Sequence, residues 1–156
     1  MSSYKKKLIN KLIMLLIVVF VIGWYVLYFH ELHVKKTALN ESELLNDGFS
    51  YSLDEDVTDT DGKISGWIIK QGTSIGTCSI NVILKECDSM NAYILPTQVD
   101  KRADVTTLIS DGNNYDYSGF EAQIGNIDKD KQYVLCFKLE INNIVYYYNT
   151  QQMITL

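Results

Sequence analysis

Hydrophobic and polar positions divide this chain into one continuous apolar segment and a longer region of short alternating runs. Residues Leu12–Phe29 carry no charge and are mostly apolar, and four lysines come just before them, at Lys5, Lys6, Lys7 and Lys11. A helix of roughly 20 apolar residues crosses the ~30 Å hydrocarbon core of a bilayer. The pattern therefore predicts a transmembrane helix over 12–29, preceded by a basic cytoplasmic tail over 1–11.

The residues around the segment favour an uncleaved anchor over a signal peptide. A signal peptide has a shorter apolar region, about 7–15 residues, and ends in small residues. Here the segment ends in bulky aromatic residues, and Trp24, Tyr25 and Tyr28 suit a membrane–water interface. A buried core helix is disfavoured, because apolar residues surround the whole segment and no second apolar helix could cover it.

Charge is distributed unevenly between the two parts of the chain. Residues 1–36 contain six lysines and one glutamate, whereas residues 37–156 contain eight basic and eighteen acidic residues. The more basic flank of a membrane helix normally stays in the cytoplasm, so the C-terminal part is expected outside. Its acidic character argues against nucleic acid as a partner, since phosphate binding requires a basic surface.

The C-terminal part predicts an all-β domain over 49–156. Residues 30–48 are expected to form a juxtamembrane stub, helical over Val34–Leu45, and Asn142-Asn143 is expected to form a tight hairpin turn. Alternating runs and turn residues predict seven or eight short strands, at Phe49–Leu53, Ile64–Lys70, Thr77–Cys87, Ala92–Leu95, Phe120–Ile124, Tyr133–Glu140, Ile144–Asn149 and Met153–Leu156. Turns every 8–12 residues or so are typical of an antiparallel β-sandwich. Asp104 is expected to cap a helical turn over Val105–Ile109.

Several of these residues form a recognisable pattern: Ile64-Ser65-Gly66-Trp67, Leu95-Pro96-Thr97-Gln98, Arg102-Ala103-Asp104-Val105, Asn113–Phe120 and Tyr133. Over about Lys63–Thr150 the chain resembles the small immunoglobulin-like β-sandwich domains attached to bacterial membrane proteins and to glycosyltransferases of cell-surface polysaccharide assembly. The resemblance implies an immunoglobulin-like fold and a place in the cell envelope. It supplies no catalytic residues, and Ala103 stands where the family commonly has proline.

The strongest polar candidates are Arg102 and Asp104. An arginine can grip a carboxylate or phosphate in a fork, but a spacing of two residues favours a local structural clamp. Trp67 invites a sugar-stacking interpretation, although its position in an alternating strand favours the core. Acidic residues over Asp54–Asp61 could gather calcium, but the spacing of a calcium loop is not met, so a solvated acidic linker is favoured.

The run Tyr146-Tyr147-Tyr148 must place rings on both faces of a strand. The solvent-side rings are candidates for a ligand or partner contact, and aromatic protection of an edge strand is the alternative.

Three cysteines, Cys78, Cys87 and Cys136, fall in the β domain, and Cys87 and Cys136 share the polar phase of their strands. They are the preferred pair for a disulfide, provided that their strands are neighbours; three unpaired thiols are the alternative. His30 and His33 lack a third ligand for zinc.

No catalytic motif or phosphate loop occurs, so no cofactor, metal or enzymatic activity is expected. The leading hypothesis is a single-pass, membrane-anchored interaction module of the bacterial cell envelope, accessory to surface polysaccharide assembly. One alternative is a carbohydrate-binding domain that uses exposed tyrosines. Another is an accessory subunit whose helix packs against a polytopic membrane protein, although Gly23 is the only small residue in the span.

Overall fold

The computed structural model describes residues 3–31, 33–39, 42, 44–45, 47–54 and 62–156, and it divides the chain into two units, Met1–His33 and Val34–Leu156. The first unit is helix α1, Ser3–Glu31. Its window Ile9–Val26 is long and apolar enough to cross a membrane, and none of that window is buried. The expected N-terminal apolar helix is thus present. It extends beyond the predicted span because the lysine-rich residues before Leu12 are also helical.

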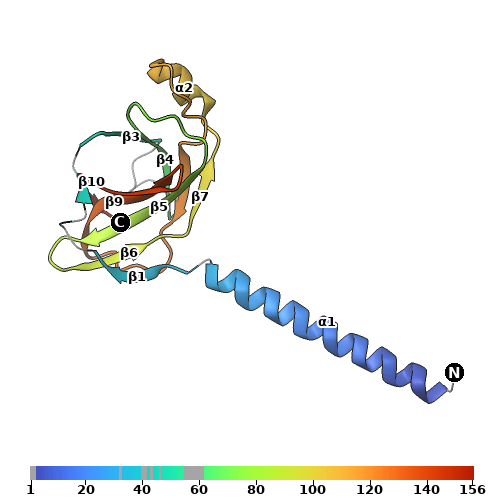
Figure 1. Cartoon of the computed structure of the whole chain (residues 1–156). Coiled ribbons are helices and arrows are strands. Elements are labelled where there is room, and N and C mark those ends of the chain that lie inside the picture. The colour runs from blue at the N-terminus through green and yellow to red at the C-terminus, as the bar shows by residue number, and fades with distance from the viewer. Residues whose placement is uncertain (1–2, 32, 40–41, 43, 46, 55–61) are drawn as a thin grey trace. The chain divides into compact units, whose positions relative to one another are not determined.

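The described residues of the second unit form two β-sheets and the short helix α2, as Figure 1 shows. The six-stranded sheet has the order β1-β6-β5-β9-β10-β2, and the four-stranded sheet has the order β3-β4-β8-β7. Their bounds are β1 Lys35–Ala38, β2 Leu44–Leu45, β3 Phe49–Leu53, β4 Lys63–Lys70, β5 Cys78–Glu86, β6 Asn91–Ile94, β7 Thr97–Asp100, β8 Gly119–Gln123, β9 Gln132–Ile141 and β10 Ile144–Thr155. Helix α2, Ala103–Ile109, lies at the end of the domain away from β1 and β6 (Figure 1).

The main core lies between the two sheets, because alternate residues of their strands point inward. Phe137 of β9 contacts Phe120 of β8 at 5.1 Å and Tyr51 of β3 at 6.0 Å between ring centroids. Ile68 and Leu84 are completely buried in the same cluster. The prediction of an all-β domain behind one apolar helix is therefore confirmed.

The expected helical stub over Val34–Leu45 is wrong. Residues Lys35–Ala38 form β1 on the edge of β6, and Leu44–Leu45 form β2 in parallel with β10. A short helix with few apolar contacts is marginal, whereas each strand here gains ladder hydrogen bonds, and Leu39 becomes buried in a second apolar cluster. The compact unit thus begins at Val34 rather than at Phe49.

Most of the predicted strands are present, with small shifts at their ends. The Asn142-Asn143 turn is confirmed, and both residues have positive φ, 51° and 66°. Met153 belongs to β10 beyond a bulge rather than to a separate strand. Asp104 does not cap α2: Arg102 occupies the cap position and makes no side-chain capping bond, while Asp104 lies in the first turn.

Candidate functional site

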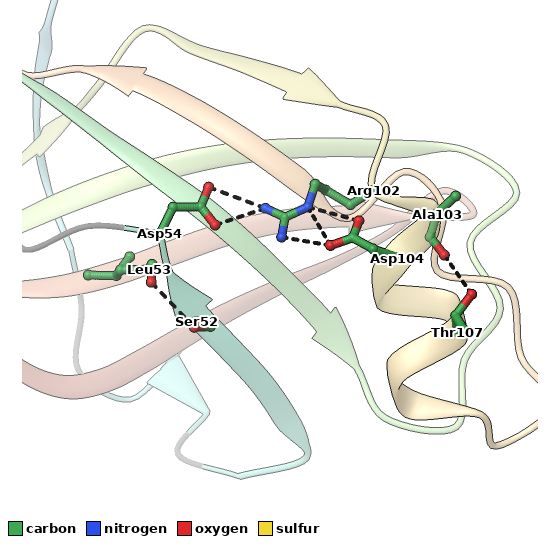
Figure 2. A network of polar contacts seen from close by, with 7 residues as sticks. All are labelled: Ser52, Leu53, Asp54, Arg102, Ala103, Asp104 and Thr107. Carbon is green, nitrogen blue, oxygen red and sulfur yellow. Dashed lines mark hydrogen bonds and ion pairs between the residues drawn. The ribbon is translucent and has the colours of Figure 1, made fainter.

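The most connected polar side chain of the domain is Arg102, at the corner between β7 and α2 (Figure 2). Its Nη1 donates to both carboxylate oxygens of Asp54, at 2.9 and 3.2 Å. Its Nε donates to both oxygens of Asp104, at 3.0 and 3.1 Å, and Nη2 adds a bond of 2.9 Å. One guanidinium therefore joins the end of β3 to the start of α2.

Electrostatics favour the ionised forms of Arg102 and Asp104. Hydrogen bonds from Asp104 and Asp54 raise the pKa of Arg102, and the Arg102 guanidinium lowers the pKa of Asp104. Three of the guanidinium nitrogens already donate to carboxylates. The arrangement acts as a structural clamp, because the guanidinium holds both carboxylates at once.

The backbone of Arg102 belongs to the same corner. Its N–H donates to the Asp116 carbonyl at 2.6 Å, and its own carbonyl accepts from Val105 at 3.0 Å. Within α2, Thr107 Oγ1 donates to the Ala103 carbonyl at 3.2 Å, as Figure 2 also shows. The corner is therefore held both by main-chain bonds and by the guanidinium.

Gly66 and Gly119, which belong to the residue pattern of the sequence analysis, leave space for this corner because they have no side chain. A Cβ on Gly119 would lie 2.6 Å from Cγ of Arg102 and 2.9 Å from the Asp100 carbonyl oxygen. A Cβ on Gly66 would overlap the Ser52 carbonyl oxygen. The glycines therefore allow the arginine stem and the neighbouring strand to approach closely. The structure brings the Arg102-x-Asp104, Gly66-Trp67 and Ser118-Gly119 motifs to one sheet.

Trp67 lies on the outer face of that sheet. Its register partners are Ser52 on β3 and Gly119 on β8, while the preceding Gly66 pairs with Phe120, which points into the core. Trp67 is half-buried and packs against the margin of the core. The interpretation of Trp67 as a core residue holds in part: its ring packs against the main core, but alternation places it on the other side of β4 from Ile68.

Glu86 forms a second polar network, which the sequence analysis did not anticipate. Its Oε1 accepts from Tyr93 and Lys131, each at 2.9 Å, and its Oε2 accepts from Ser89 at 2.6 Å and Asn91 at 3.0 Å. These bonds lower the pKa of the Glu86 carboxyl far below its usual value, against the effect of burial. The sequence could have indicated that Glu86 is buried, because alternation along β5 places it on the same face as the buried residues Val82 and Leu84.

The three consecutive tyrosines have different environments. Tyr148 is buried and stacks on Phe49 at 4.8 Å. Tyr146 meets the edge of Phe49 at 5.9 Å and has Lys70 Nζ 5.0 Å from its ring centroid. Tyr147 points to the opposite face and packs against the cluster of Leu39. Tyr146 and Tyr147 are therefore partly exposed and Tyr148 is buried, and a ligand or partner contact at the exposed rings stays a prediction.

The three cysteines are free thiols, and the proposed Cys87–Cys136 pairing is wrong. The Cys87 N–H bonds to the Gln132 carbonyl at 3.1 Å, four residues along β9 from Cys136. That separation is about 13 Å along a strand, too far for a disulfide. Burial raises the pKa of Cys78 to about 11 and that of Cys136 to about 12.

Metal-binding residues do not gather within the described part of the chain: no group of three or more His, Cys, Asp and Glu side chains is placed to hold an ion there. Residues 55–61 of the acidic segment lie outside the described residues, so the linker interpretation stays a prediction. No protein-family model, no curated protein and no solved structure gives a match to this chain.

Proposed function

We propose that this chain is a single-pass membrane protein, with its N-terminus in the cytoplasm and its acidic β domain outside, and that the domain is a non-enzymatic interaction module of the bacterial cell envelope. The observation that carries the proposal is the fully unburied apolar window Ile9–Val26 of α1. In water such a surface would be costly, at roughly 25 cal/mol per Å² of apolar area. A bilayer removes that cost, and the four lysines at the N-terminal end of the helix, Lys5, Lys6, Lys7 and Lys11, favour a cytoplasmic N-terminus.

An immunoglobulin-like assignment of the domain belongs to the same proposal, and the strand order supports it. Immunoglobulin sandwiches pair strands A-B-E-D in one sheet and C-F-G in the other, with C′ added beside C in some members. If β3 to β10 are labelled A, B, C, C′, D, E, F and G, the two sheets become A-B-E-D and C′-C-F-G. Strands β1 and β2 then extend the second sheet at its two edges.

One hydrogen bond adds support for this assignment. Tyr133, near the start of β9, is buried and donates its hydroxyl to the Asp128 carbonyl at 2.7 Å. A tyrosine near the start of strand F that bonds to backbone a few residues upstream is the tyrosine corner of immunoglobulin-like domains. The position supports the resemblance in fold; it carries no activity with it.

Membrane insertion is tested by alkaline carbonate extraction of vesicles that contain the full chain. We expect the wild-type chain to stay in the membrane pellet, and Val19→Arg to shift a measurable part to the supernatant. An arginine at the centre of a span costs about 2.5–3.5 kcal/mol on insertion scales. Ser79→Arg, the same new residue at an exposed position of β5, is the matched control. Release of the wild-type chain would overturn the proposal.

Orientation is tested with a membrane-impermeant maleimide on intact cells. A Cys87→Ser parent gives the background signal of the two remaining thiols. Asn126→Cys, in an exposed loop of the domain, should become labelled before lysis, and Ser3→Cys only after lysis. The reverse order would contradict an extracytoplasmic domain while leaving membrane insertion intact.

The role as an interaction module is tested by crosslinking in whole cells. The anchor over 12–29 is replaced by polyleucine, which keeps the hydrophobic length and removes its side-chain pattern. Retained crosslinked partners, including components of polysaccharide assembly, would support the outer domain as the contact surface. Loss of all partners would favour the alternative of an accessory helix that packs against a polytopic protein.

A further inference from the structure

The start of the β domain contributes a strand to each edge of the six-stranded sheet. Strand β1 pairs with β6 at one edge, and β2 pairs with β10 at the opposite edge. Residues 39–43 alone join these two strands, so the chain passes from one edge of the sheet to the other between Ala38 and Leu44. We call β1, Leu39 and β2 together the strap.

The strap packs on the outer face of the sheet. Phe137 of β9 points into the main core, so Cys136, the residue before it, points to the outer face. Leu39 of the strap is 4% exposed and packs on a cluster formed by the completely buried Ile83, Ala92 and Cys136. The first residue of β2 packs against the same cluster. The strap therefore covers an apolar area on the side of the sheet away from the main core.

Few contacts hold the strap in place. β1 pairs with its neighbour at four positions and β2 at two, and each strand lies at an edge of the sheet. Among the described strap residues, Leu39 alone is buried, whereas six of the nine residues of the central strand β5 are buried. Segments with few buried apolar contacts open at a lower free energy than the core of a domain. The strap is thus the part of the sheet that is easiest to detach.

We propose that the strap opens as a unit and uncovers the apolar outer face of the sheet, with the Cys136 thiol, while the two-sheet core stays folded. The strap would then control when this face is exposed. Residues 32–34 alone separate α1 from β1, so any force on the anchor enters the domain at the strap. The inference goes beyond the proposed function, because opening itself does not depend on which side of a membrane the domain occupies.

Cys136 reports on the opening, because the strap covers it. Burial raises the pKa of this thiol to about 12, so the covered thiol is protonated and unreactive at about pH 8. The full chain in detergent micelles carries Cys78→Ser and Cys87→Ser, which leaves Cys136 as its one thiol. It is labelled with excess N-ethylmaleimide at urea concentrations below the unfolding midpoint. We expect a labelling rate that depends only weakly on urea, since local opening exposes little surface.

A matched reporter lies in the main core. Ala122 of β8 is completely buried there, and Ala122→Cys, in a chain with Cys78→Ser, Cys87→Ser and Cys136→Ala, places a small thiol at that position. A core thiol becomes reactive only on global unfolding, which near-UV circular dichroism measures independently. Its labelling should be slower than that of Cys136 by about tenfold or more and should rise steeply with urea.

Two substitutions separate local opening from global unfolding. Leu39→Ala removes the buried contact of the strap and should speed Cys136 labelling by about tenfold or more. Ile68→Val weakens the main core, in which Ile68 is completely buried. It should speed labelling of the Ala122→Cys reporter and leave that of Cys136 unchanged. Because Ile68→Val keeps the strap intact, it tests the proposal even if Leu39→Ala fails to fold.

Three results would overturn the proposal. One is labelling of Cys136 and of the Ala122→Cys reporter at the same rate and with the same dependence on urea. Another is an equal acceleration of both by Ile68→Val. The third is a folded Leu39→Ala chain whose Cys136 labelling matches that of the parent. Carbonate extraction and topology would be unaffected by any of these results, so the proposed membrane anchoring stands or falls separately.

Discussion

Two charged side chains, Glu86 and Arg102, are each held by several charge-assisted hydrogen bonds, yet their surroundings differ. The Glu86 carboxylate is 7% exposed and accepts four bonds from four residues of the β5–β6 turn, β6 and the loop before β9. The Arg102 side chain is 27% exposed and its partner carboxylates are more exposed still. The hydrogen bonds of Glu86 and Arg102 have similar lengths, but the Glu86 carboxylate lies in a more buried environment, where the dielectric constant is lower.

From this difference we expect burial, more than bond geometry, to determine what each network contributes to the free energy of unfolding. Water can replace the partners of an exposed ion pair, and measured values for such pairs are about 0–1 kcal/mol. A buried network cannot exchange partners with water, so a missing member leaves the others unsatisfied. The substitutions below test that distinction, from the largest expected effect to the smallest.

Glu86→Ala should have the largest effect. It leaves the partly buried Tyr93 hydroxyl and Asn91 amide without their acceptor, whereas the Lys131 side chain is 46% exposed and can bond to water. We expect a loss of about 2 kcal/mol in the free energy of unfolding. Urea unfolding of the full chain in micelles, followed by near-UV circular dichroism, measures it. Asp88→Ala, at an exposed position of the same turn, should change stability little. Equal effects of the two substitutions would refute the role of burial.

The Glu86 carboxylate should also affect how steeply the stability of the domain falls at acidic pH. Its folded pKa is lowered, chiefly by the Ser89 and Asn91 hydrogen bonds, from an ordinary value of 4.5. A lowered folded pKa means that the stabilisation is complete above the unfolded pKa and declines as pH falls below about 4.5. The melting temperature should drop between pH 5 and about 3, and less steeply in Glu86→Gln. The pKa of the exposed Asp104 carboxyl is also lowered, so its protonation at acidic pH reduces stability in the same direction.

If the melting temperature falls equally steeply with pH in the wild type and in Glu86→Gln, other carboxylates control acid unfolding. A control at neutral pH is also needed, because Glu86→Gln loses a charge and should start from a lower melting temperature. The informative quantity is therefore the slope of melting temperature against pH, not its absolute value.

Sequence patterning predicted the parts of the fold that depend on local periodicity. Thr77–Cys87 alternates clearly and Phe49–Leu53 gives a weaker signal, and both are strands within a residue of their expected bounds. The Asn142-Asn143 turn follows from the tolerance of asparagine for positive φ. Strands β1 and β2 were missed because their segment was expected to be helical, and the short strand β7, which pairs with β8 directly after Pro96, was missed as well.

The candidate site was predictable only where partners are close in sequence. Arg102 and Asp104, two residues apart, were anticipated as a clamp; Asp54, 48 residues away, was not. Trp67 was expected in the core, and it packs against the core only in part, from the side of β4 opposite Ile68; because Ile68 and Ile69 beside it are both buried, the apolar run hides the phase of the strand. Cys136 was placed on a polar face that Leu39, from a segment expected to be helical, in fact covers.

Arg102→Ala should destabilise the domain less than Glu86→Ala, by about 1 kcal/mol or less. The loss should shrink further in high salt, because exposed pairs are screened. Arg102→Lys should recover only part of it, since a lysine cannot make both forked contacts. Urea unfolding at low and high ionic strength measures both effects. A loss as large as that of Glu86→Ala would mean that this corner is effectively buried.

Ala103→Pro should have the smallest effect and the opposite sign. Ala103 is the first residue of α2, after Arg102 at the cap, and proline is favoured at that position because its fixed φ suits the helix and no intrahelical N–H bond is lost. Fewer unfolded conformations should stabilise the domain by about 0.5 kcal/mol. Thr107→Pro, in the interior of the helix, is the matched control and should destabilise it. If Ala103→Pro weakens the domain instead, the clamp depends on a backbone freedom at Arg102 that a following proline removes, since proline restricts the residue before it.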